Sequence, residues 1–247
     1  MFCDAVAAIG PEHAARFCSR FVDGTWVTIK LLILSSVFGL MIAVPMALAR
    51  VSRSPLLSAP AYAYIYVFRG TPLLIQLFVI YYGLAQFEAV REGMFWPILR
   101  DAYWCGLITL TLNTSAYVAE ILRGGIRAVP HGEIEAARAC GMSTALTYRR
   151  LILPMAFRIA WPAYGNEVIL LLKGSALVST ITVFDLMGVT RTLFSRTYSL
   201  DIFVYAGLIY FAITFVLTGL FRTAEHRLNR HMRERPRTAP ALPPRTA

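Results

Sequence analysis

Charged residues are scarce in this sequence. Asp, Glu, Lys and Arg make up 15 % of its 247 residues, hydrophobic residues make up 57 %, and the mean hydropathy is +0.58. Soluble domains carry about 25 % charged residues, so this composition excludes an ordinary soluble protein. Acidic residues are the scarcest, with 14 against 24 Lys and Arg. The basic excess lies beside apolar segments and does not alternate with exposed aromatic residues, which favours anchoring at a membrane surface over nucleic-acid binding.

The patterns of nucleotide, metal and catalytic sites are also missing. A phosphate-binding loop requires Gly-x-x-x-x-Gly-Lys-Ser/Thr, and Lys173-Gly174-Ser175 has the wrong order. The histidines lie in separate aqueous segments without metal-ligand spacing, and the serines of the apolar segments lack a nearby base. We therefore expect no metal, no cofactor and no catalytic set in this chain, and any energy source must lie in another protein.

The sequence has four cysteines, and their spacing does not fit a metal site. Cys105 and Cys140 are expected to be small, buried or half-buried residues, while Cys3 and Cys18 could meet on the outer side of a membrane. The N-terminus lacks a basic region followed by a short apolar region, so we expect no cleaved signal peptide. Membrane insertion would then depend on the first apolar segment.

Five apolar segments are long enough to cross a bilayer, which requires about 20 residues. They cover residues 25–49, 59–84, 103–122, 162–184 and 202–221. Each is continuously apolar rather than alternating, which excludes barrel strands. The second segment is interrupted by Arg69-Gly70-Thr71-Pro72, where a kink or break is expected because Pro72 removes a backbone hydrogen bond. The sequence therefore predicts an all-α membrane protein, a bundle of five spans.

The distribution of arginines predicts the orientation. Most arginines flank the spans on one side, in the stretch 123–158 and in the tail after residue 222. The positive-inside bias places that side and the C-terminus in the cytoplasm, and the N-terminus in the periplasm. We expect an outer segment over residues 1–24, a membrane domain over residues 25–222 and a basic, partly disordered tail over residues 223–247.

An Arg-rich stretch at residues 129–154 joins the third and fourth spans. It contains Glu135-Ala136-Ala137, then Gly141, then Leu151-Ile152-Leu153-Pro154. Small alanines would let another protein approach a helix backbone closely, with Ala137 facing that partner. Gly141 would end the first helix or allow a sharp turn, Ser143 would cap a second short helix, and Pro154 would limit how that helix continues. The stretch therefore predicts a helix-turn-helix docking element facing water.

This element resembles the EAA loop of ABC-importer permeases, with Leu151 where the family more often has Ile. From about residue 24 to 222 the chain is similar to the polar amino acid branch, and in particular to M-type permeases of histidine/lysine/arginine/ornithine and opine importers. The further motifs that carry the resemblance are Arg69-Gly70-Thr71-Pro72-Leu73-Leu74-Ile75-Gln76, Leu112-Asn113-Thr114-Ser115-Ala116-Tyr117, Ala128-Val129-Pro130-His131-Gly132 and Asn166-Glu167-Val168. The resemblance implies a type I importer permease fold in the bacterial inner membrane. The residues it implies for coupling to an ATPase are Glu135, Ala136, Ala137, Gly141, Leu153 and Pro154.

Charged residues inside spans are costly, and they mark either a solute pathway or a buried pair. Glu167 and Lys173 both lie in the fourth span, but six residues separate them, so they do not share a helix face. Glu167 instead shares a face with Leu171 and Gly174, where the glycine leaves room for a ligand or a helix. Two interpretations stay open: Glu167 contacts the solute, or it is a structural partner of Arg158, of Arg69 or of a residue on a second permease subunit.

Two further polar groups have two interpretations each. Asn113 lies in the middle of the third span and could bind a solute or join helices through hydrogen bonds. The break at Arg69 could aim a helix end at a carboxylate, or it could shape the bundle. Glu120 lies near the end of its span and is expected to pair with Arg123 or Arg127. The candidate solute pathway is therefore Glu167, Asn113, Lys173 and Arg69.

The predicted function is that of a permease subunit in an ATP-driven importer. By resemblance the substrate is a polar, basic amino acid or an opine. The implied partners are a dimer of ATP-binding subunits, a second permease subunit (a sister or a copy), a periplasmic solute-binding protein and the lipid bilayer. Two alternatives belong to other classes: a secondary transporter, which would need internal repeats and coupling-ion ligands, and a membrane enzyme, which would need a catalytic set.

Overall fold

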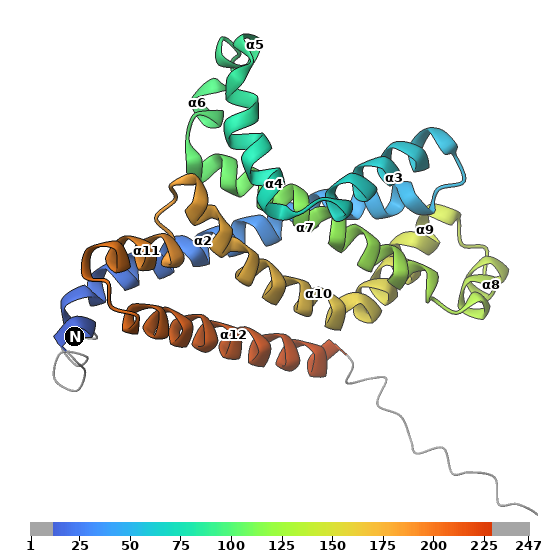
Figure 1. Cartoon of the computed structure of the whole chain (residues 1–247). Coiled ribbons are helices and arrows are strands. Elements are labelled where there is room, and N and C mark those ends of the chain that lie inside the picture. The colour runs from blue at the N-terminus through green and yellow to red at the C-terminus, as the bar shows by residue number, and fades with distance from the viewer. Residues whose placement is uncertain (1–11, 229–247) are drawn as a thin grey trace, which may run out of the picture.

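The computed structural model describes residues 12–228, with side chains from residue 18 onward. Within this part of the chain every regular element is a helix, which confirms the all-α prediction (Figure 1). The elements are α2 (Glu12–Val51), α3 (Pro55–Gly70), α4 (Leu73–Phe78), η1 (Val79–Gly83), η2 (Leu84–Gln86), α5 (Glu88–Arg91), α6 (Trp96–Leu99), α7 (Ala102–Arg127), α8 (His131–Ala139), α9 (Thr144–Thr147), η3 (Tyr148–Ile152), α10 (Leu153–Ser175), η4 (Ala176–Ile181), α11 (Leu186–Thr197) and α12 (Asp201–Leu228).

Three described helices are long and apolar enough to cross a membrane by themselves, namely α2, α7 and α12. The 26 residues of α7 span about 39 Å at 1.5 Å per residue, more than the roughly 30 Å of a bilayer core. Two further pairs pass the same criterion together but are bent: Pro55–Gly70 with Leu73–Gln86 by 106°, and Thr144–Ile181 with Leu186–Thr197 by 50°. The chain thus has three such helices, or up to five if each bent pair is one span.

Helices α2, α7 and α10 form the packed centre of the molecule, and small residues bring them together. A Cβ on Gly125 of α7 would lie 2.5 Å from the carbonyl oxygen of Ala156 on α10. A Cβ on Gly39 of α2 would lie 2.6 Å from the Thr114 side chain on α7. Because real Cβ atoms do not approach backbone so closely, Gly125 requires glycine, whereas a side chain at residue 39 would displace the Thr114 side chain. The resulting interior is apolar, and two clusters built on α2, α7 and α10 fill it.

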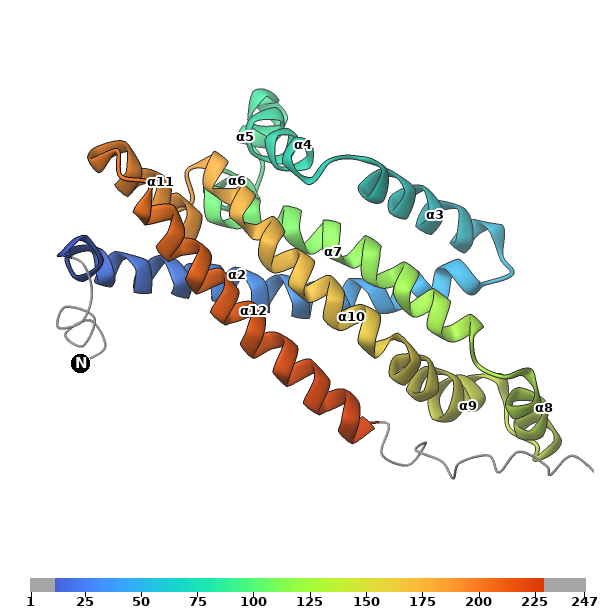
Figure 2. The ribbon, with the colours of Figure 1, turned by 60° about the horizontal axis from the view of Figure 1, so that its bottom comes forward.

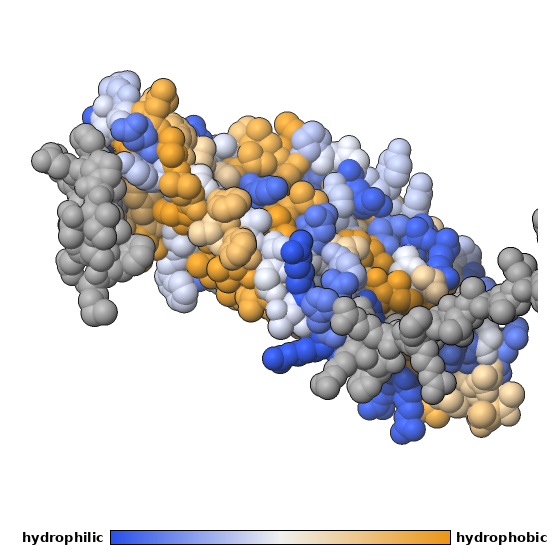
Figure 3. Space-filling view, turned by 90° about the horizontal axis from the view of Figure 1, so that it is seen from below, coloured by the Kyte–Doolittle hydropathy of each residue, from blue (hydrophilic) through white to orange (hydrophobic). Residues whose placement is uncertain are grey.

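Helix α12 stands apart from this centre and runs along one side of the molecule beside α11 and α10 (Figures 1 and 2). It is the least buried of the three long helices. Its exposed side chains are large and apolar, among them Leu208, Phe211 and Phe215. Figure 3 shows hydrophobic residues over much of this face, with hydrophilic residues toward the end that carries α8 and α9. The apolar part of the face suits contact with lipid or with another membrane protein.

A compact hydrogen-bonded cluster joins three helices where η4 turns into α11. Asp185 caps α11 by accepting the Gly188 N–H at 2.8 Å, and the Tyr210 hydroxyl of α12 donates to its other oxygen at 3.5 Å. The Thr28 hydroxyl of α2 accepts the Leu186 N–H at 3.0 Å. We call Thr28, Asp185, Leu186, Gly188 and Tyr210 the Asp185 cluster. It fixes the bend between η4 and α11 against α2 and α12.

Several helix boundaries differ from those expected. Helix α2 is continuous from Glu12, so residues 12–24 extend the first span without a break. Helix α12 continues to Leu228, beyond the expected end of the membrane domain, while residues 229–247 of the tail lie outside the described residues. Cys105 is buried as expected, but Cys140 is exposed, because it lies on the C-cap of α8 at the surface. Cys3 lies outside the described residues, so its relation to Cys18 stays a prediction.

Candidate functional site

A polar pocket of about 440 Å³ opens between the α3–α4 break, α7 and α10. It is lined by Arg69, Gly70, Thr71, Pro72, Leu73, Asn113, Thr114, Tyr117, Glu167, Leu170, Leu171 and Gly174, which we call the Arg69 pocket. Three of the four residues predicted for a solute pathway, Arg69, Asn113 and Glu167, therefore meet at one place although about a hundred positions separate the first from the last. The predicted face of Glu167, Leu171 and Gly174 is confirmed, because all three line the pocket.

The wall formed by the α3–α4 break follows from the local sequence. Thr71 precedes a proline and is held in extended backbone, with φ −116° and ψ 144°, so α3 ends at Gly70. The side-chain amide of Gln76 then donates to the freed carbonyls of Phe68 (2.8 Å) and Thr71 (3.0 Å). The break bends the chain by 106°, which is sharper than a kink, and Gln76 satisfies two of the carbonyls that it frees. It turns the Arg69 end of α3 toward the pocket.

Asn113 joins helices through hydrogen bonds, which confirms one of its two predicted interpretations. Its side-chain amide donates to the Gln76 Oε1 at 3.0 Å and to the Phe68 carbonyl at 3.4 Å, so it joins α7 to both sides of the break. It also lines the Arg69 pocket. A change at Asn113 would therefore alter the shape of the pocket as well as its polarity.

Glu167 is the acidic residue of the pocket. It is 8 % exposed and lies on α10, and among the described residues its carboxylate has no hydrogen bond and no ion pair. The charge of Arg69 across the pocket nevertheless acts on it. One and two turns further along α10, Leu171 and Gly174 leave the pocket wall apolar, and a Cβ on Gly174 would lie 3.1 Å from the Leu73 side chain. The residue is thus buried within the chain, while its carboxylate has no direct partner and faces a cavity.

Arg69 is the basic residue of the pocket and lies at its rim, with its side chain 45 % exposed. One of its nitrogens is 4.0 Å from a carboxylate oxygen of Glu120, and its guanidinium lies 5.3 Å from the centre of the Tyr117 ring. Glu120 is held by the bidentate guanidinium of Arg123, at 2.6–2.9 Å, which confirms one of the two predicted partners. Arg50 is a third cation at Glu120, with its Nε 3.6 Å from the Glu120 Oε1.

Lys173, the fourth predicted pathway residue, is not brought to this site. It is exposed and is absent from the lining of the Arg69 pocket, because six residues turn it to another face of α10. The sequence had excluded a Glu167–Lys173 pair on one face, and this is confirmed. The assignment of Lys173 to the pathway is not supported by its position.

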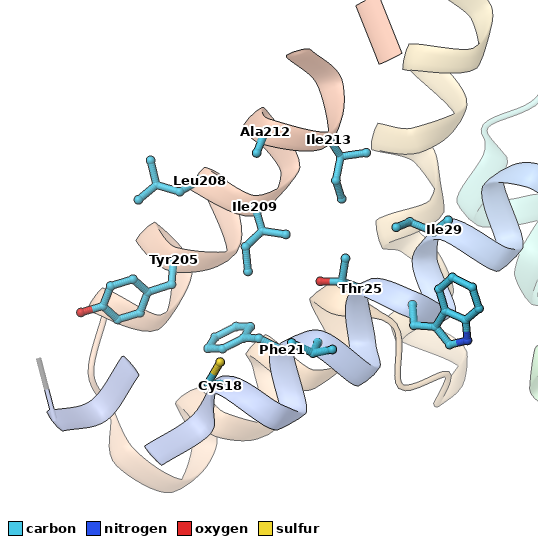
Figure 4. A pocket seen from close by; sticks show the side chains of 11 residues that line it. Cys18, Phe21, Thr25, Ile29, Tyr205, Leu208, Ile209, Ala212 and Ile213 are labelled. Atoms are coloured by element: carbon cyan, nitrogen blue, oxygen red, sulfur yellow. The ribbon is translucent and has the colours of Figure 1, made fainter. Parts of the chain in front are cut away.

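A second hollow is larger but chemically different. It has a volume of about 620 Å³ and lies between the first part of α2 and α12, with Phe21, Ile29, Tyr205 and Ile213 among its lining residues (Figure 4). Among the side chains that the structure describes, none that is charged lines it. An apolar hollow of this kind cannot compensate the lost hydration of a charged solute, so the Arg69 pocket is the better candidate site.

The segment between α7 and α10 forms the predicted helix-turn-helix element. Helix α8 ends in a Schellman motif: Gly141 has φ +76°, its N–H bonds to the Arg138 carbonyl at 2.9 Å, and the Met142 N–H bonds to the Ala137 carbonyl at 3.1 Å. The Ser143 hydroxyl caps α9 by accepting the Leu146 N–H at 3.4 Å. Both predictions for this turn, a sharp change at Gly141 and a cap at Ser143, are confirmed.

One expectation for the same element is wrong. Ala137 was expected to face a partner, but it is 8 % exposed and packs within the chain, whereas Glu135 and Ala136 on the neighbouring faces of α8 are exposed. Pro154 affects how the second helix continues without ending it, since α9, η3 and α10 follow one another in helical backbone. The wide π turn of η3 lies just before Pro154, where proline cannot supply the usual hydrogen bond.

Of the six residues predicted for coupling, Glu135, Ala136, Gly141 and Pro154 are exposed. Leu153 is half-buried and packs against the apolar cluster of α2, α7 and α10. A partner seated on the exposed residues would therefore act on α10 through Leu153 and the helix start. Since α10 also carries Glu167, the element and the Arg69 pocket are joined by a single continuous helix.

The chain resembles known transport proteins over most of its length. The model of the family described as "Binding-protein-dependent transport system inner membrane component" matches residues 35–230. The chain belongs to this family. It is 49 % identical over 210 residues to the nopaline transport system permease protein NocM of Agrobacterium fabrum, covering 84 % of this chain and 87 % of that protein. It is 47 % identical over 212 residues to the histidine/lysine/arginine/ornithine transport system permease protein HisM of Escherichia coli K12, covering 85 % and 89 %.

A solved structure supports the same assignment. A crystal structure of an amino acid ABC transporter with histidines superposes with a TM-score of 0.78 and 37 % identity, covering 87 % of this chain and 97 % of that chain. An inward-facing structure of the MetNI methionine ABC transporter has a TM-score of 0.73 at 19 % identity, and this likeness shows the fold alone. The protein is therefore an inner-membrane permease with the fold of ABC importer permeases.

Some residues of the site were not identified from the sequence. Thr114, next to Asn113, and Tyr117, one helical turn after it, both line the pocket. Helical spacing from Asn113 could have indicated Tyr117. Gln76 stabilises the break by a hydrogen bond to the carbonyl of Phe68, which lies eight residues earlier. No short-range sequence pattern predicts this contact. The approach of Arg50 and Arg69 to Glu120 depends on the packing of α2 and α3 against α7, which the sequence does not reveal.

Proposed function

We propose that this chain is the membrane-spanning subunit of an ATP-driven importer of polar amino acids, with basic amino acids and the opines derived from them as its substrates. The observation that carries the proposal is that one pocket is lined by both a carboxylate without a direct partner, Glu167, and a loosely held guanidinium, Arg69. An α-amino acid brings an ammonium and a carboxylate, and the two groups of the pocket have the complementary charges. The names of the relatives, which transport nopaline, histidine, lysine, arginine and ornithine, agree with this substrate class.

The proposal includes five spans, with the N-terminus in the periplasm and the C-terminus in the cytoplasm. Each of the two bent helix pairs then crosses the membrane once, and the arginine-rich side, including α8 and α9, faces the cytoplasm. This orientation places the docking element on the side where ATP is available. A reporter that is active only in the periplasm should be silent when fused after Arg222 and active when inserted near Glu92. The reverse pattern would remove α8 from the side of the ATPase and contradict the proposal.

The partners follow from this arrangement. A separate ATP-binding subunit, itself a dimer, docks on the exposed part of the α8–α9 element and supplies the hydrolysis, so this chain has no cofactor and no catalytic residue of its own. A second permease subunit, a sister or a second copy, completes the pathway. A periplasmic binding protein delivers the solute. The exposure of Glu135, Ala136, Gly141 and Pro154 supports the first contact.

The substrate and the energy source can be tested in one preparation. The complex of this chain with its co-purified ATP-binding subunits and sister permease is reconstituted into liposomes, and uptake of arginine, lysine, histidine, ornithine and nopaline is measured with the cognate binding protein outside. We expect uptake of at least one of these solutes that requires both internal ATP and the binding protein. Uptake driven by an ion gradient without ATP would instead support a secondary transporter and contradict the proposal.

A further inference from the structure

Three guanidiniums from three helices converge on Glu120. Arg123, on the same helix, occupies both carboxylate oxygens at 2.6–2.9 Å. Arg50 of α2 approaches to 3.6 Å, and its Nε is buried without a hydrogen-bond acceptor among the described residues. Arg69 of α3 is the most distant, at 4.0 Å. One carboxylate thus faces three cations, so its negative charge is not enough to hold all three firmly.

Arg69 is the cation that is held least. Among residues 12–228 its guanidinium donates no hydrogen bond, and its contacts are the 4.0 Å approach to Glu120 and the Tyr117 ring. A guanidinium has five N–H donors and recognises a carboxylate through two of them at once. Arg69 therefore stands at the rim of the pocket with its binding capacity free.

A second carboxylate competes for the same cation. Glu167 lines the pocket with Arg69, and the charge of Arg69 acts on it, but the two form no ion pair. The side chain of Arg69 is long, flexible and partly exposed, so rotation toward Glu167 costs little. If Arg69 and Glu167 formed an ion pair, neither charge would be free to bind the opposite charge of a zwitterionic solute. A solute would first have to separate them.

We propose that Glu120 is a positioning residue that keeps Arg69 and Glu167 apart. The attraction of Glu120 holds Arg69 at the rim, and because Arg123 already occupies both oxygens, the hold is weak enough for an incoming carboxylate to replace it. Without the charge of Glu120, the repulsion of Arg50 and Arg123 drives Arg69 toward Glu167 and closes the pocket with an ion pair. The inference rests on the proposed function insofar as it assigns a solute to this pocket.

The test is the chemical reactivity of Glu167, which does not depend on the identity of the solute. Dicyclohexylcarbodiimide, an apolar reagent, modifies protonated carboxyls in membranes, and mass spectrometry of the peptide containing Glu167 gives the rate in the purified complex. In Glu120→Gln we expect the rate to fall about fivefold or more, the lower range of couplings between sites. Adding Arg69→Gln to that variant should restore the rate. Glu88→Gln, which removes an exposed charge far from the pocket, is the matched control and should change nothing.

Uptake separates this inference from the proposed function. In the reconstituted complex, Glu120→Gln should raise the KM for arginine about fivefold or more with little change in maximal rate, and in a Glu167→Gln background it should add no further loss. An unchanged modification rate of Glu167 in Glu120→Gln overturns the inference whatever the uptake shows. Suppose that the modification rate of Glu167 falls in Glu120→Gln but the KM is unchanged in Glu167→Gln. This result contradicts a role of the pocket in substrate binding and leaves the positioning of Arg69 by Glu120 intact.

A conservative variant covers the case in which Glu120→Gln does not assemble. Glu120→Asp keeps the negative charge beside Arg123 but withdraws it from Arg69 by one methylene group. We expect a smaller fall in the modification rate of Glu167, again reversed by Arg69→Gln. If Glu167 is modified at the wild-type rate in Glu120→Asp, and Glu120→Gln fails to assemble, Glu120 is purely structural.

Discussion

The Asp185 cluster and the Arg69 pocket are both polar regions between apolar helices, but they differ in how their charged groups are satisfied. Asp185 is fully buried, at 0 % exposure, and accepts hydrogen bonds from the Gly188 N–H and the Tyr210 hydroxyl. Glu167 is almost as buried, at 8 %, yet it has no direct partner among the described residues and faces a cavity. Burial of an acid therefore does not by itself identify a solute site.

The comparison teaches that an unpaired charge beside a cavity is the more informative feature. Buried polar groups with full sets of partners stabilise one arrangement of helices. A buried carboxylate without a partner carries a free-energy cost that a ligand can remove. We accordingly expect mutations at the Asp185 cluster to lower stability, and mutations at the Arg69 pocket to lower transport without lowering stability.

The largest loss of stability is expected in the helix packing that supports both regions. In Gly125→Ala the new Cβ would lie 2.5 Å from the Ala156 carbonyl oxygen, so α7 and α10 must move apart, at a cost of about 3 kcal/mol. The thermal midpoint of the purified complex measures the loss. The adjacent Gly124→Ala is the control, because its Cβ would meet nothing within 4 Å. Equal midpoints for the two variants would contradict the packing described here.

The next largest effect is expected at Asp185. Asp185→Ala removes the N-cap of α11 and leaves the Tyr210 hydroxyl without its acceptor, which should cost about 2 kcal/mol. Asp185→Asn keeps an acceptor oxygen and should cost less. Uptake per assembled complex should be unchanged in both variants, since Asp185 does not line the Arg69 pocket. A specific loss of uptake at normal stability would place Asp185 in the solute pathway and contradict the distinction between the Asp185 cluster and the Arg69 pocket.

A smaller effect on stability is expected at the docking element. Gly141 has φ +76°, so Gly141→Ala adds strain of about 1 kcal/mol to the turn between α8 and α9 without creating a steric clash. Binding of the ATP-binding subunit, measured by co-purification, should weaken while the chain remains in the membrane. Gly132→Ala is the control, because Gly132 lies in α8 with open space around it. Normal binding in Gly141→Ala would argue against this turn as the coupling contact.

Much of the fold follows from local sequence signals. Continuous apolar runs predicted long apolar helices, three of which can cross a membrane by themselves. Pro72 predicted the break after α3, and Gly141 with Ser143 predicted the turn between α8 and α9. Each of these signals acts over a few residues, through backbone sterics or a capping side chain, so tertiary packing did not change the outcome.

The parts that failed depend on which way a helix faces. Ala137 and Lys173 were assigned by residue type, but rotation of α8 buries the first and rotation of α10 turns the second away from the pocket. Pro154 was expected to limit how the helix continues, but its residue type did not reveal that the helix would continue through a π turn. The charge pattern around Glu120 was only half predicted, because the i,i+3 contact with Arg123 is local whereas Arg50 and Arg69 come from other helices.

The most direct test of the account is Glu167→Gln, measured for stability and for transport in the same preparation. If Glu167 meets the solute, the free energy of unfolding, followed through the thermal midpoint, should stay within about 0.5 kcal/mol of that of the wild-type complex. The KM for uptake of arginine should rise about tenfold, equivalent to 1.4 kcal/mol. Glu88→Gln, an exposed residue on α5, should alter neither quantity. A lowered thermal midpoint with an unchanged KM would make Glu167 a structural acid like Asp185 and contradict the assignment of the Arg69 pocket to the solute.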